Sequence, residues 1–376
     1  MRDRKGYEAA IEALREVASR ARVWVSMPVI EGITPRVLVD AKDAHEMPDR
    51  SGLVRRDKIF RLDEIGLSPL DHVALYGDAV FEGILIRNRS IFLYQQHLER
   101  IEASAAKIDL EIPLDRQTLT ERILETCQSV QFPEGNGYIR LVITRGLGDL
   151  GINPLKCVTA TMFAIVSTIR LYPREAYAKG IPLGLARRIR RPSASILDPN
   201  IKSNNYLNNV LALLEGTRGR GFVESLMLTE KGFVAEATVD NIFSVVRHSG
   251  WETDPSRVEV RTPSSEYCLV GITRGAVMEL ARKRGYRVSV RDDLLPVDLV
   301  GPGRECFMTG TGAGVMPINS IEDVDVGDGK PGPVTLALVD DINRMMLDPA
   351  NGLPIDTPKA MIAEALEERA SERSAG

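Results

Sequence analysis

Lys202-Ser203-Asn204-Asn205-Tyr206 is the stretch around which the chain is organised, because it sets an amine among small and amide-bearing side chains just before a helix. That helix is predicted from apolar residues that recur at spacings of three and four, up to the glycines at 216 and 219: Leu207, Val210, Leu211 and Leu214. A lysine near a helix start is usually a solvated surface residue. Lys202 becomes a candidate functional residue only in combination with a second stretch of sequence.

The second stretch is Val234-Ala235-Glu236-Ala237-Thr238-Val239-Asp240-Asn241. It follows a predicted hairpin in which residues 225–228 turn at 230–232 and return from 233, so that Glu236 falls at a strand end beside apolar neighbours. A lone glutamate after a strand is usually a turn residue. An amine and a carboxylate, both at element boundaries, together favour a cofactor site.

The bulk composition indicates a globular protein and excludes two classes of partner. A chain of 376 residues exceeds one ordinary core, so two domains are expected. Hydrophobic residues make up 44% and charged residues 27%. A net charge of −4 and a pI near 5.8 argue against binding to nucleic acid or to a membrane surface. We expect the one basic cluster, residues 187–191, to be a solvated strand edge.

The cysteines and histidines bear on redox state and metals. Cys127, Cys157, Cys268 and Cys306 are far apart in apolar surroundings, which predicts reduced, mostly buried thiols. Four histidines without a His/Cys cluster predict no metal site. No apolar run reaches membrane-spanning length, and the N-terminus is charged and helical, so we expect a cytoplasmic protein.

The pattern along the chain predicts α/β (α+β) domains with antiparallel or mixed sheets. We expect helices over 3–22, 94–107, 116–129, 273–284 and 333–347, besides the one after Lys202. Strands are expected at 53–54, 58–60, 83–86, 138–144, 158–169, 183–190, 241–247, 286–290 and 305–308. The expected division is an N-terminal extension over 1–49, a small N-terminal α/β domain over 50–170, a linker over 171–180, a C-terminal domain over 181–350, and a tail over 351–376 that is expected to be partly disordered after 355.

Two segments of the second half are suited to hold an anion. Residues 271–275, Gly-Ile-Thr-Arg-Gly, open a helix, where unpaired N–H groups and the dipole favour a phosphate. Residues 309–312, Thr-Gly-Thr-Gly, follow a strand and let the backbone approach a ligand. The glycines at 310–314 also suggest a dinucleotide-binding loop, but Pro317 comes too soon for the helix that such a loop must open. An oxidoreductase is therefore a remote alternative.

The amine, the carboxylate and two anion-binding loops together suggest pyridoxal 5′-phosphate. This cofactor needs an amine for a Schiff base, a carboxylate that keeps its ring nitrogen protonated, and donors for its phosphate. Lys202, Glu236 and the loops at 271–275 and 309–312 are candidates for these three roles.

At this point the sequence resembles the class IV, or fold type IV, aminotransferases, and within them most closely the branched-chain amino acid aminotransferases. The similarity is collinear from about residue 50 to 347. It rests on these blocks: 75–84 (LYGDAVFEGI), 97–100 (HLER), 138–140 (YIR), 202–206 (KSNNY), 236–241 (EATVDN), 269–274 (LVGITR), 307–311 (FMTGT) and 332–335 (GPVT).

The resemblance implies a small N-terminal α/β domain, a larger C-terminal domain of pseudobarrel type, and a homodimer or larger homo-oligomer. It implies that Lys202 forms the Schiff base and moves a proton, that Glu236 faces the pyridine nitrogen, and that Tyr206 bonds the phenolic oxygen. The remaining cofactor-binding residues that it implies are Arg100, Leu269, Gly271, Ile272, Thr273 and Thr311. The substrate-binding residues that it implies are Tyr76, Phe81, Gly83, Tyr138, Arg140, Gly312 and Ala313.

Departures from the family pattern bear on the substrate. Many branched-chain enzymes have an arginine where this chain has Leu85. D-specific relatives have an Arg-x-His carboxylate trap after the Thr-Arg-Gly that stands here at 144–146, and no such trap follows Arg145. We therefore expect amino-group transfer between L-leucine, isoleucine or valine and 2-oxoglutarate. A D-amino acid transaminase, an aminodeoxychorismate lyase and a non-catalytic scaffold protein stay open as alternatives.

Overall fold

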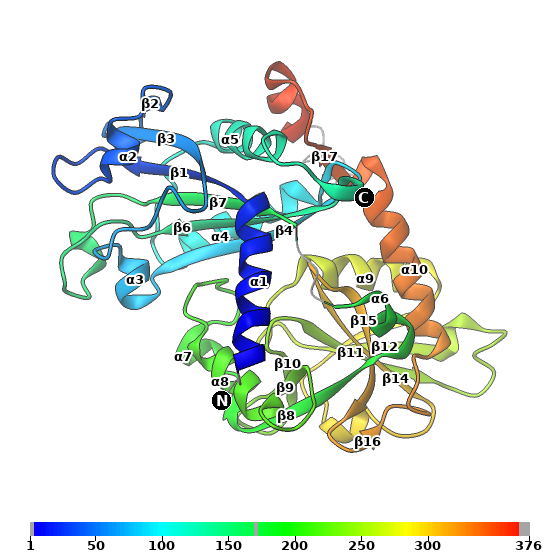
Figure 1. Cartoon of the computed structure of the whole chain (residues 1–376). Helices are drawn as coiled ribbons and strands as arrows, with labels where there is room; N and C mark the ends of the chain where they lie inside the picture. The colour runs from blue at the N-terminus through cyan, green and yellow to red at the C-terminus, as the bar shows by residue number, and fades with distance from the viewer. Residues whose placement is uncertain (1–3, 169–171, 368–376) are drawn as a thin grey trace. The chain divides into compact units, whose positions relative to one another are not determined.

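The structure is a computed structural model that describes residues 4–168 and 172–367. The chain divides into two compact units (Figure 1). Unit 1 contains residues 4–168, 202–205 and 349–367, and unit 2 contains residues 172–201 and 206–348. The short segment 202–205 therefore belongs to unit 1, although the chain on both sides of it belongs to unit 2.

Unit 1 is built on an eight-stranded sheet in the order β17-β5-β4-β6-β7-β1-β3-β2. All its neighbouring strands are antiparallel. The strands are β1 (Arg22–Pro28), β2 (His45–Pro48), β3 (Val54–Arg61), β4 (Ala79–Arg87), β5 (Ser90–Phe92), β6 (Gly137–Thr144), β7 (Met162–Ser167) and β17 (Gly352–Pro354). The strands predicted at 58–60, 83–86, 138–144 and 158–169 lie within or across β3, β4, β6 and β7.

Two helices that cover this sheet follow the sequence periodicity closely. They are α4 (Tyr94–Ala106), which packs on β4, and α5 (Arg116–Gln128), which packs on β1 and β7. Their predicted inward residues are all buried: Leu98, Ile101 and Ala105 on α4, and Leu119, Ile123, Leu124 and Cys127 on α5. The hydroxyl of Tyr94 donates to Thr120 Oγ1 at 3.1 Å, which joins the two helices.

The N-terminal residues contribute more to unit 1 than an extension would. Strand β1 lies inside the sheet between β7 and β3. Its residues Val23, Val25 and Met27 pack with Leu38 and Phe60 in a buried cluster. The helices here are α1 (Arg4–Arg20), α2 (Arg36–Val39) and α3 (His72–Tyr76), and α1 confirms the helix predicted over 3–22. The residues before 50 thus supply part of the core. Of the predicted tail over 351–376, residues 352–354 form β17 in the sheet, and the residues past 367 lie outside the described part of the chain.

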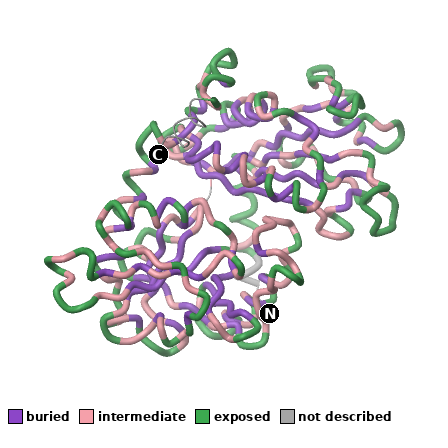
Figure 2. Tube along the Cα trace, turned by 180° about the vertical axis from the view of Figure 1, so that it is seen from behind, coloured by how far each residue is buried: buried purple, intermediate pink, exposed green. Residues whose placement is uncertain are grey.

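Unit 2 is built on a nine-stranded mixed sheet whose main order is β10-β9-β8-β15-β14-β11-β12-β13, with β16 beside β15. The strands are β8 (Ile181–Arg190), β9 (Glu224–Leu228), β10 (Val234–Ala237), β11 (Asn241–Arg247), β12 (Val258–Pro263), β13 (Arg287–Arg291), β14 (Arg304–Gly310), β15 (Gly314–Ile321) and β16 (Val324–Asp325). Strands β9 and β10 form the predicted antiparallel hairpin, and its second strand contains Glu236. Figure 2 shows buried residues concentrated along the strands of both sheets.

The helices of unit 2 are α6 (Arg174–Lys179), α7 (Ala194–Leu197), α8 (Leu207–Thr217), α9 (Ile272–Lys283) and α10 (Pro333–Leu347). Single 3-10 turns occur in the chain at Pro133–Gly135, Pro154–Lys156, Pro255–Arg257, Pro296–Asp298, Pro349–Asn351 and Lys359–Met361. Helices α9 and α10 confirm the helices predicted over 273–284 and 333–347. The segment predicted as a linker over 171–180 contains α6 in its described part.

Helix α8 exists where it is predicted, but it faces the opposite way from a normal amphipathic helix. Its apolar stripe is exposed, with Leu207 at 65% and Leu214 at 49%, whereas Asn209, Ala212 and Gly216 are buried. Packing against β8 and β9 requires small residues, because a Cβ on Gly216 would meet Ser225 Oγ at 2.1 Å. The apolar spacing of α8 therefore does not mark its buried side.

The fold class agrees with the expectation of a two-domain α/β (α+β) architecture with antiparallel and mixed sheets. All four cysteines are free thiols, and all except Cys157 are buried, as expected. In the described part of the chain, no helix combines the length and apolarity needed to cross a membrane.

Candidate active site

Lys202 lies on a short segment that pairs with β4 in unit 1. The N–H of Phe81 donates to the Lys202 carbonyl at 2.9 Å, and the N–H of Asn204 donates to the Ala79 carbonyl at 2.8 Å. This part of the strand edge is accessible because β5 pairs with β4 only at Ile86 and Arg87. The backbone of Lys202 is thus fixed to a buried strand, and α8 begins only at Leu207.

The Lys202 side chain lies beside a set of predicted substrate residues on one face of β4 and β6. Gly83 is directly opposite Arg140 in the register, and strand alternation places Phe81 and Tyr138 on the same face. Lys202 Nζ is 4.6 Å and Arg140 Cζ is 4.5 Å from the centroid of the Phe81 ring. Arg140 Nη2 also donates to the Tyr138 hydroxyl at 3.4 Å. An amine, a guanidinium, a phenol and an aromatic wall therefore converge.

The opposite face of β4 carries a buried ionic cluster that the sequence does not reveal. Glu82 is 0% exposed and accepts bonds from Arg100 Nε and Nη2, both at 2.7 Å. His97 Nδ1 lies 2.6 Å from Glu82 Oε2. Burial alone raises the pKa of Glu82, but Arg100 and then His97 outweigh burial and hold this pKa at about 2 instead of 4.5. Arg100, predicted to bind phosphate, is thereby oriented by two of its five N–H groups.

Replacing Glu82 by glutamine is expected to destabilise unit 1 by roughly 3 kcal/mol at neutral pH, because the Arg100 guanidinium loses its buried counterion. The folded-state pKa of Glu82 is lowered, so its stabilisation is complete above pH 4.5 and is lost as the pH falls toward 2. Urea unfolding of both proteins should show the difference shrinking to about half near pH 3. Glu46→Gln is the matched control on a pair whose carboxylate is 60% exposed, and a pH-independent difference for Glu82→Gln would contradict the expectation.

Tyr76 is another predicted substrate residue of unit 1. It ends α3, and its hydroxyl donates to the Leu150 carbonyl at 2.6 Å. His72, in the same helix, reaches the Gly151 carbonyl at 3.1 Å through Nε2 and Asp78 Oδ2 at 3.0 Å through Nδ1. Tyr76 and His72 thus hold the loop around residue 150.

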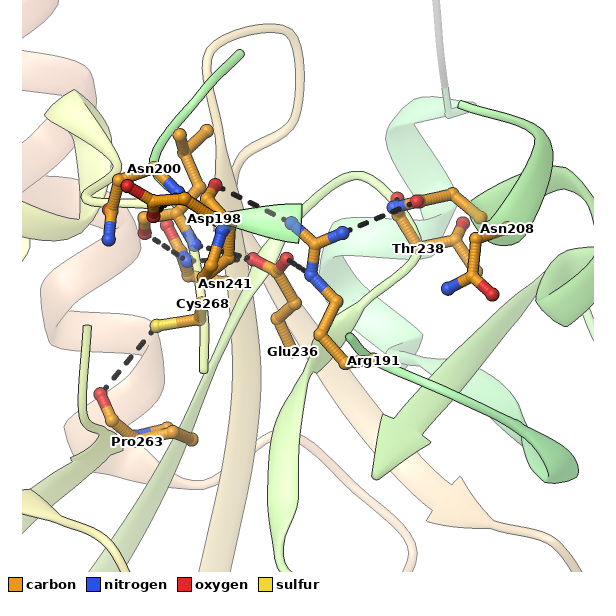
Figure 3. A network of polar contacts seen from close by, with 12 residues as sticks. Arg191, Asp198, Asn200, Asn208, Glu236, Thr238, Asn241, Pro263 and Cys268 are labelled. Carbon is orange, nitrogen blue, oxygen red and sulfur yellow. Dashed lines mark hydrogen bonds and ion pairs between the residues drawn. The ribbon is translucent and has the colours of Figure 1, made fainter. Parts of the chain in front are cut away.

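In unit 2, Glu236 lies on β10 with both carboxylate oxygens engaged (Figure 3). Oε1 is 2.7 Å from Arg191 Nε. Oε2 accepts from the Leu269 N–H at 3.1 Å and from Asn241 Nδ2 at 3.3 Å. Glu236 is 5% exposed, and its charge is compensated by a guanidinium and two amide donors.

Asn241 connects Glu236 to the start of α9. Its Nδ2 also donates to the Leu269 carbonyl at 2.8 Å, and its Oδ1 occupies the space where a Cβ on Gly271 would stand, 2.0 Å away. Gly271 is the N-cap of α9 and has no side chain with which to cap it. The first N–H groups of this helix, together with the buried Thr273 hydroxyl, form the kind of end that binds phosphate.

The second predicted anion loop is the turn of a β-hairpin. Gly310 on β14 pairs with Gly314 on β15, and residues 311–313 form the turn. Residues 311–321 therefore form a turn and a strand in place of the helix that a dinucleotide-binding loop would open. The hydroxyl of Tyr177 donates to the Ala313 carbonyl at 2.9 Å, which fixes the end of the turn. Tyr206 is the N-cap residue of α8.

The interpretation of residues 187–191 as a solvated strand edge is wrong for Arg191. Arg187 and Arg188 are 70% and 87% exposed, but the Arg191 side chain is 11% exposed and paired with Glu236. The sequence of this run does not distinguish the buried Arg191 from its exposed neighbours, because Arg191 is buried only through its tertiary contact with Glu236. Asn241 lies in the stretch 234–241 that the sequence singles out, but its contact with Leu269 depends on the tertiary structure.

Comparisons with known proteins give one consistent result. The model of the family described as amino-transferase class IV matches residues 79–321. A putative branched-chain-amino-acid aminotransferase of Methanocaldococcus jannaschii is 36% identical over 272 residues, which are 72% of this chain and 88% of that protein. A crystal structure of a branched-chain amino acid aminotransferase from T.th. with pyridoxamine 5′-phosphate has a TM-score of 0.69 at 29% identity, covering 82% of this chain and 97% of that one. The structure of the same enzyme complexed with N-(5′-phosphopyridoxyl)-L-glutamate has a TM-score of 0.68 at 30% identity, covering 78% of this chain and 92% of that one.

Proposed function

This chain belongs to the class IV, pyridoxal-phosphate-dependent aminotransferases, and from this premise we propose that it transfers an amino group between a branched-chain L-amino acid and 2-oxoglutarate. The observation that supports this choice most is the shared contact of Lys202 Nζ and Arg140 with the Phe81 ring. A reactive amine beside an aromatic wall and a guanidinium suits both an aliphatic side chain and a second carboxylate.

The residues present suit pyridoxal phosphate. Glu236 is a buried carboxylate that forms an ion pair with Arg191 and accepts two N–H bonds, which suits a partner for a protonated ring nitrogen. Gly271 leaves the start of α9 without a side-chain cap, and a Cβ there would displace Asn241 from Glu236. When bound, the cofactor supplies electron withdrawal from the Cα–H bond of the substrate.

We assign the chain's own residues as follows. Lys202 would hold the cofactor covalently through Nζ and, once released, would remove the proton from the substrate Cα. Glu236 would be the counterion of the ring nitrogen, Tyr206 would donate to the phenolic oxygen, and Leu269 would contact the ring. The residues that would hold the phosphate are Arg100, Gly271, Ile272, Thr273 and Thr311.

The substrate is proposed to lie against the face of β4 and β6 that contains Phe81. Phe81 and Gly83 give an apolar surface for the leucine, isoleucine or valine side chain, and Arg140 with the Tyr138 hydroxyl binds the second carboxylate of glutamate. The backbone of Gly312 and Ala313 takes the α-carboxylate. Tyr76 contributes through the loop around residue 150 that its hydroxyl holds.

The test is a substrate profile. Purified protein with pyridoxal phosphate is assayed on L-leucine, L-isoleucine, L-valine and D-alanine, each with 2-oxoglutarate. We expect roughly a hundredfold higher kcat/KM, or more, for one of the L-amino acids than for D-alanine, and a preference for D-alanine would contradict the proposal. Release of pyruvate from aminodeoxychorismate would instead support the lyase alternative.

Two further expectations stay predictions. A homodimer or larger homo-oligomer is checked by sedimentation of the purified protein, where a monomer would contradict it. A cytoplasmic location is checked by fractionation of the source cells.

Replacing Gly83 by alanine is expected to raise KM for both substrates about tenfold or more, because the new Cβ would stand 2.0 Å from the Tyr138 hydroxyl. The backbone at Gly83 is an ordinary strand, so the ring must move and lose its contact with Arg140. Steady-state kinetics and a melting curve separate site damage from unfolding. Gly66→Ala is the control, since nothing lies within 4 Å of its added Cβ; equal kinetics for the two variants would contradict the placement of Tyr138.

A further inference from the structure

Arg191 is the member of the basic cluster at 187–191 that pairs with Glu236, and the proposed function gives it no role. It directly follows β8, and its N–H donates to the Leu228 carbonyl of β9 at 2.8 Å, so its backbone is fixed to the sheet. Its side chain is 11% exposed and points toward Glu236 (Figure 3). A charge removed from water at this depth is costly unless it is paired, which makes the pair with Glu236 a requirement for Arg191 itself.

The guanidinium is held in place by contacts on its other two nitrogens. Nη1 donates to Asn209 Oδ1 at 3.4 Å and Nη2 to the Pro199 carbonyl at 3.5 Å. Each bond is long, but Asn209 is itself fixed, because its Nδ2 donates to the Thr238 carbonyl at 2.7 Å. Arg191 therefore contacts the chain before Lys202 and after Tyr206 as well as Glu236, and a planar fork satisfies all three at once.

The surroundings of Pro199 are also ordered. Asn200 Nδ2 donates to the Ser265 carbonyl at 2.7 Å, and Asn200 Oδ1 accepts from the Val270 N–H at 2.9 Å. Val270 follows Leu269, whose N–H donates to Glu236 Oε2. The carboxylate thus has Arg191 on one oxygen and the segment before α9 on the other, so that residues of unit 2 set both its charge and its orientation.

We propose that Arg191 is a positioning residue that acts through Glu236, keeping this buried group ionised and aimed so that it can hold a proton on the ring nitrogen of the cofactor. A buried carboxylate without a cation favours its neutral form, and a neutral acid cannot stabilise a protonated ring. Arg191 itself does not touch the cofactor in this arrangement. The inference rests on the proposed role of Glu236.

The test compares Arg191→Gln, Arg191→Lys and the control Arg188→Gln, which removes an exposed arginine from its pair with Glu215. Apoprotein is titrated with pyridoxal phosphate, and the visible absorbance of the bound cofactor is recorded against pH. For Arg191→Gln we expect a dissociation constant roughly tenfold higher or more, and an absorbance profile shifted along the pH axis. Arg191→Lys keeps the positive charge but loses the planar guanidinium, so we expect its dissociation constant to rise by an intermediate factor of about three. The dissociation constant of the control should stay within about twofold of the wild-type value.

The double variant Arg191→Gln, Glu236→Gln separates action through Glu236 from a merely structural role. If Arg191 acts through Glu236, adding Arg191→Gln to the Glu236→Gln variant raises the dissociation constant for pyridoxal phosphate by less than about threefold. A further loss of about tenfold would overturn the proposal, as would an Arg191→Gln protein with wild-type affinity and pH profile. If Arg191→Gln does not fold, Arg191→Lys decides, and wild-type behaviour of that variant in both measurements overturns the proposal. A wild-type protein that takes up no cofactor would refute the proposed function itself.

Discussion

Replacing Lys202 by alanine is expected to lower kcat by roughly 10⁴-fold or more, since one change removes both the covalent attachment of the cofactor and the base that moves the Cα proton. The fold should survive, because the hydrogen bonds that fix this segment use the backbone of Lys202, Asn204 and β4. The contact of the Lys202 side chain with the Phe81 ring is lost. The measurement is the rate of amino-group transfer together with the melting temperature.

The control for this variant is Lys283→Ala, an exposed lysine on α9 that should leave the rate unchanged. Borohydride reduction of the wild-type holoenzyme should place the cofactor label on the peptide containing Lys202. Retention of more than about 1% of the rate by a folded Lys202→Ala protein, or a label on another lysine, would contradict the assignment.

Replacing Glu236 by glutamine is expected to lower kcat by about 10²- to 10³-fold, because the ring nitrogen loses the negative charge that keeps it protonated. The exchange preserves the shape of the side chain, yet it leaves Arg191 beside a neutral amide and should cost roughly 1–3 kcal/mol of stability. Kinetics and urea unfolding measure the two effects separately.

Glu236→Asp is the informative companion, since it keeps the charge but shortens its reach to Leu269 and Asn241. We expect it to recover part of the rate that glutamine loses. A glutamine variant as active as wild type would show that Glu236 does not face the reacting ring, whatever becomes of its stability.

The helices and strands of this chain can be predicted wherever periodicity and burial agree. Helices α4 and α5 bury the apolar stripes that their spacing indicates, and the hairpin that contains Glu236 is marked by its turn residues. Helix α8 shows the limit, because its contact with β8 is set by the volume left at Gly216 and Gly184, not by hydrophobicity. Strand β1 escapes prediction for a related reason: its place between β7 and β3 is a long-range pairing.

The candidate site also contains residues that sequence patterns indicate and residues that only the tertiary structure reveals. Lys202, Glu236 and the start of α9 stand at element boundaries, where sequence patterns are informative, and their roles stay predictions. The ionic groups that orient them are not visible in the sequence. Glu82 meets His97 and Arg100 only after α4 packs on β4, and Arg191 meets Glu236 only after the strands of unit 2 have paired. A buried ion pair has no local signature, because each partner alone looks like a surface residue.

The assignment of residues 202–205 to unit 1 has a consequence for how the protein acquires activity. The backbone of the segment that contains Lys202 pairs with β4 through Val80 and Ser203, positions separated by most of unit 1 and the beginning of unit 2. Contacts this distant form late, after local helices and hairpins. Refolding monitored by circular dichroism should therefore be faster than refolding monitored by catalysis. In addition, no single break in the polypeptide can separate unit 1 from unit 2, because residues 202–205 and 349–367 of unit 1 follow residues of unit 2 in the chain.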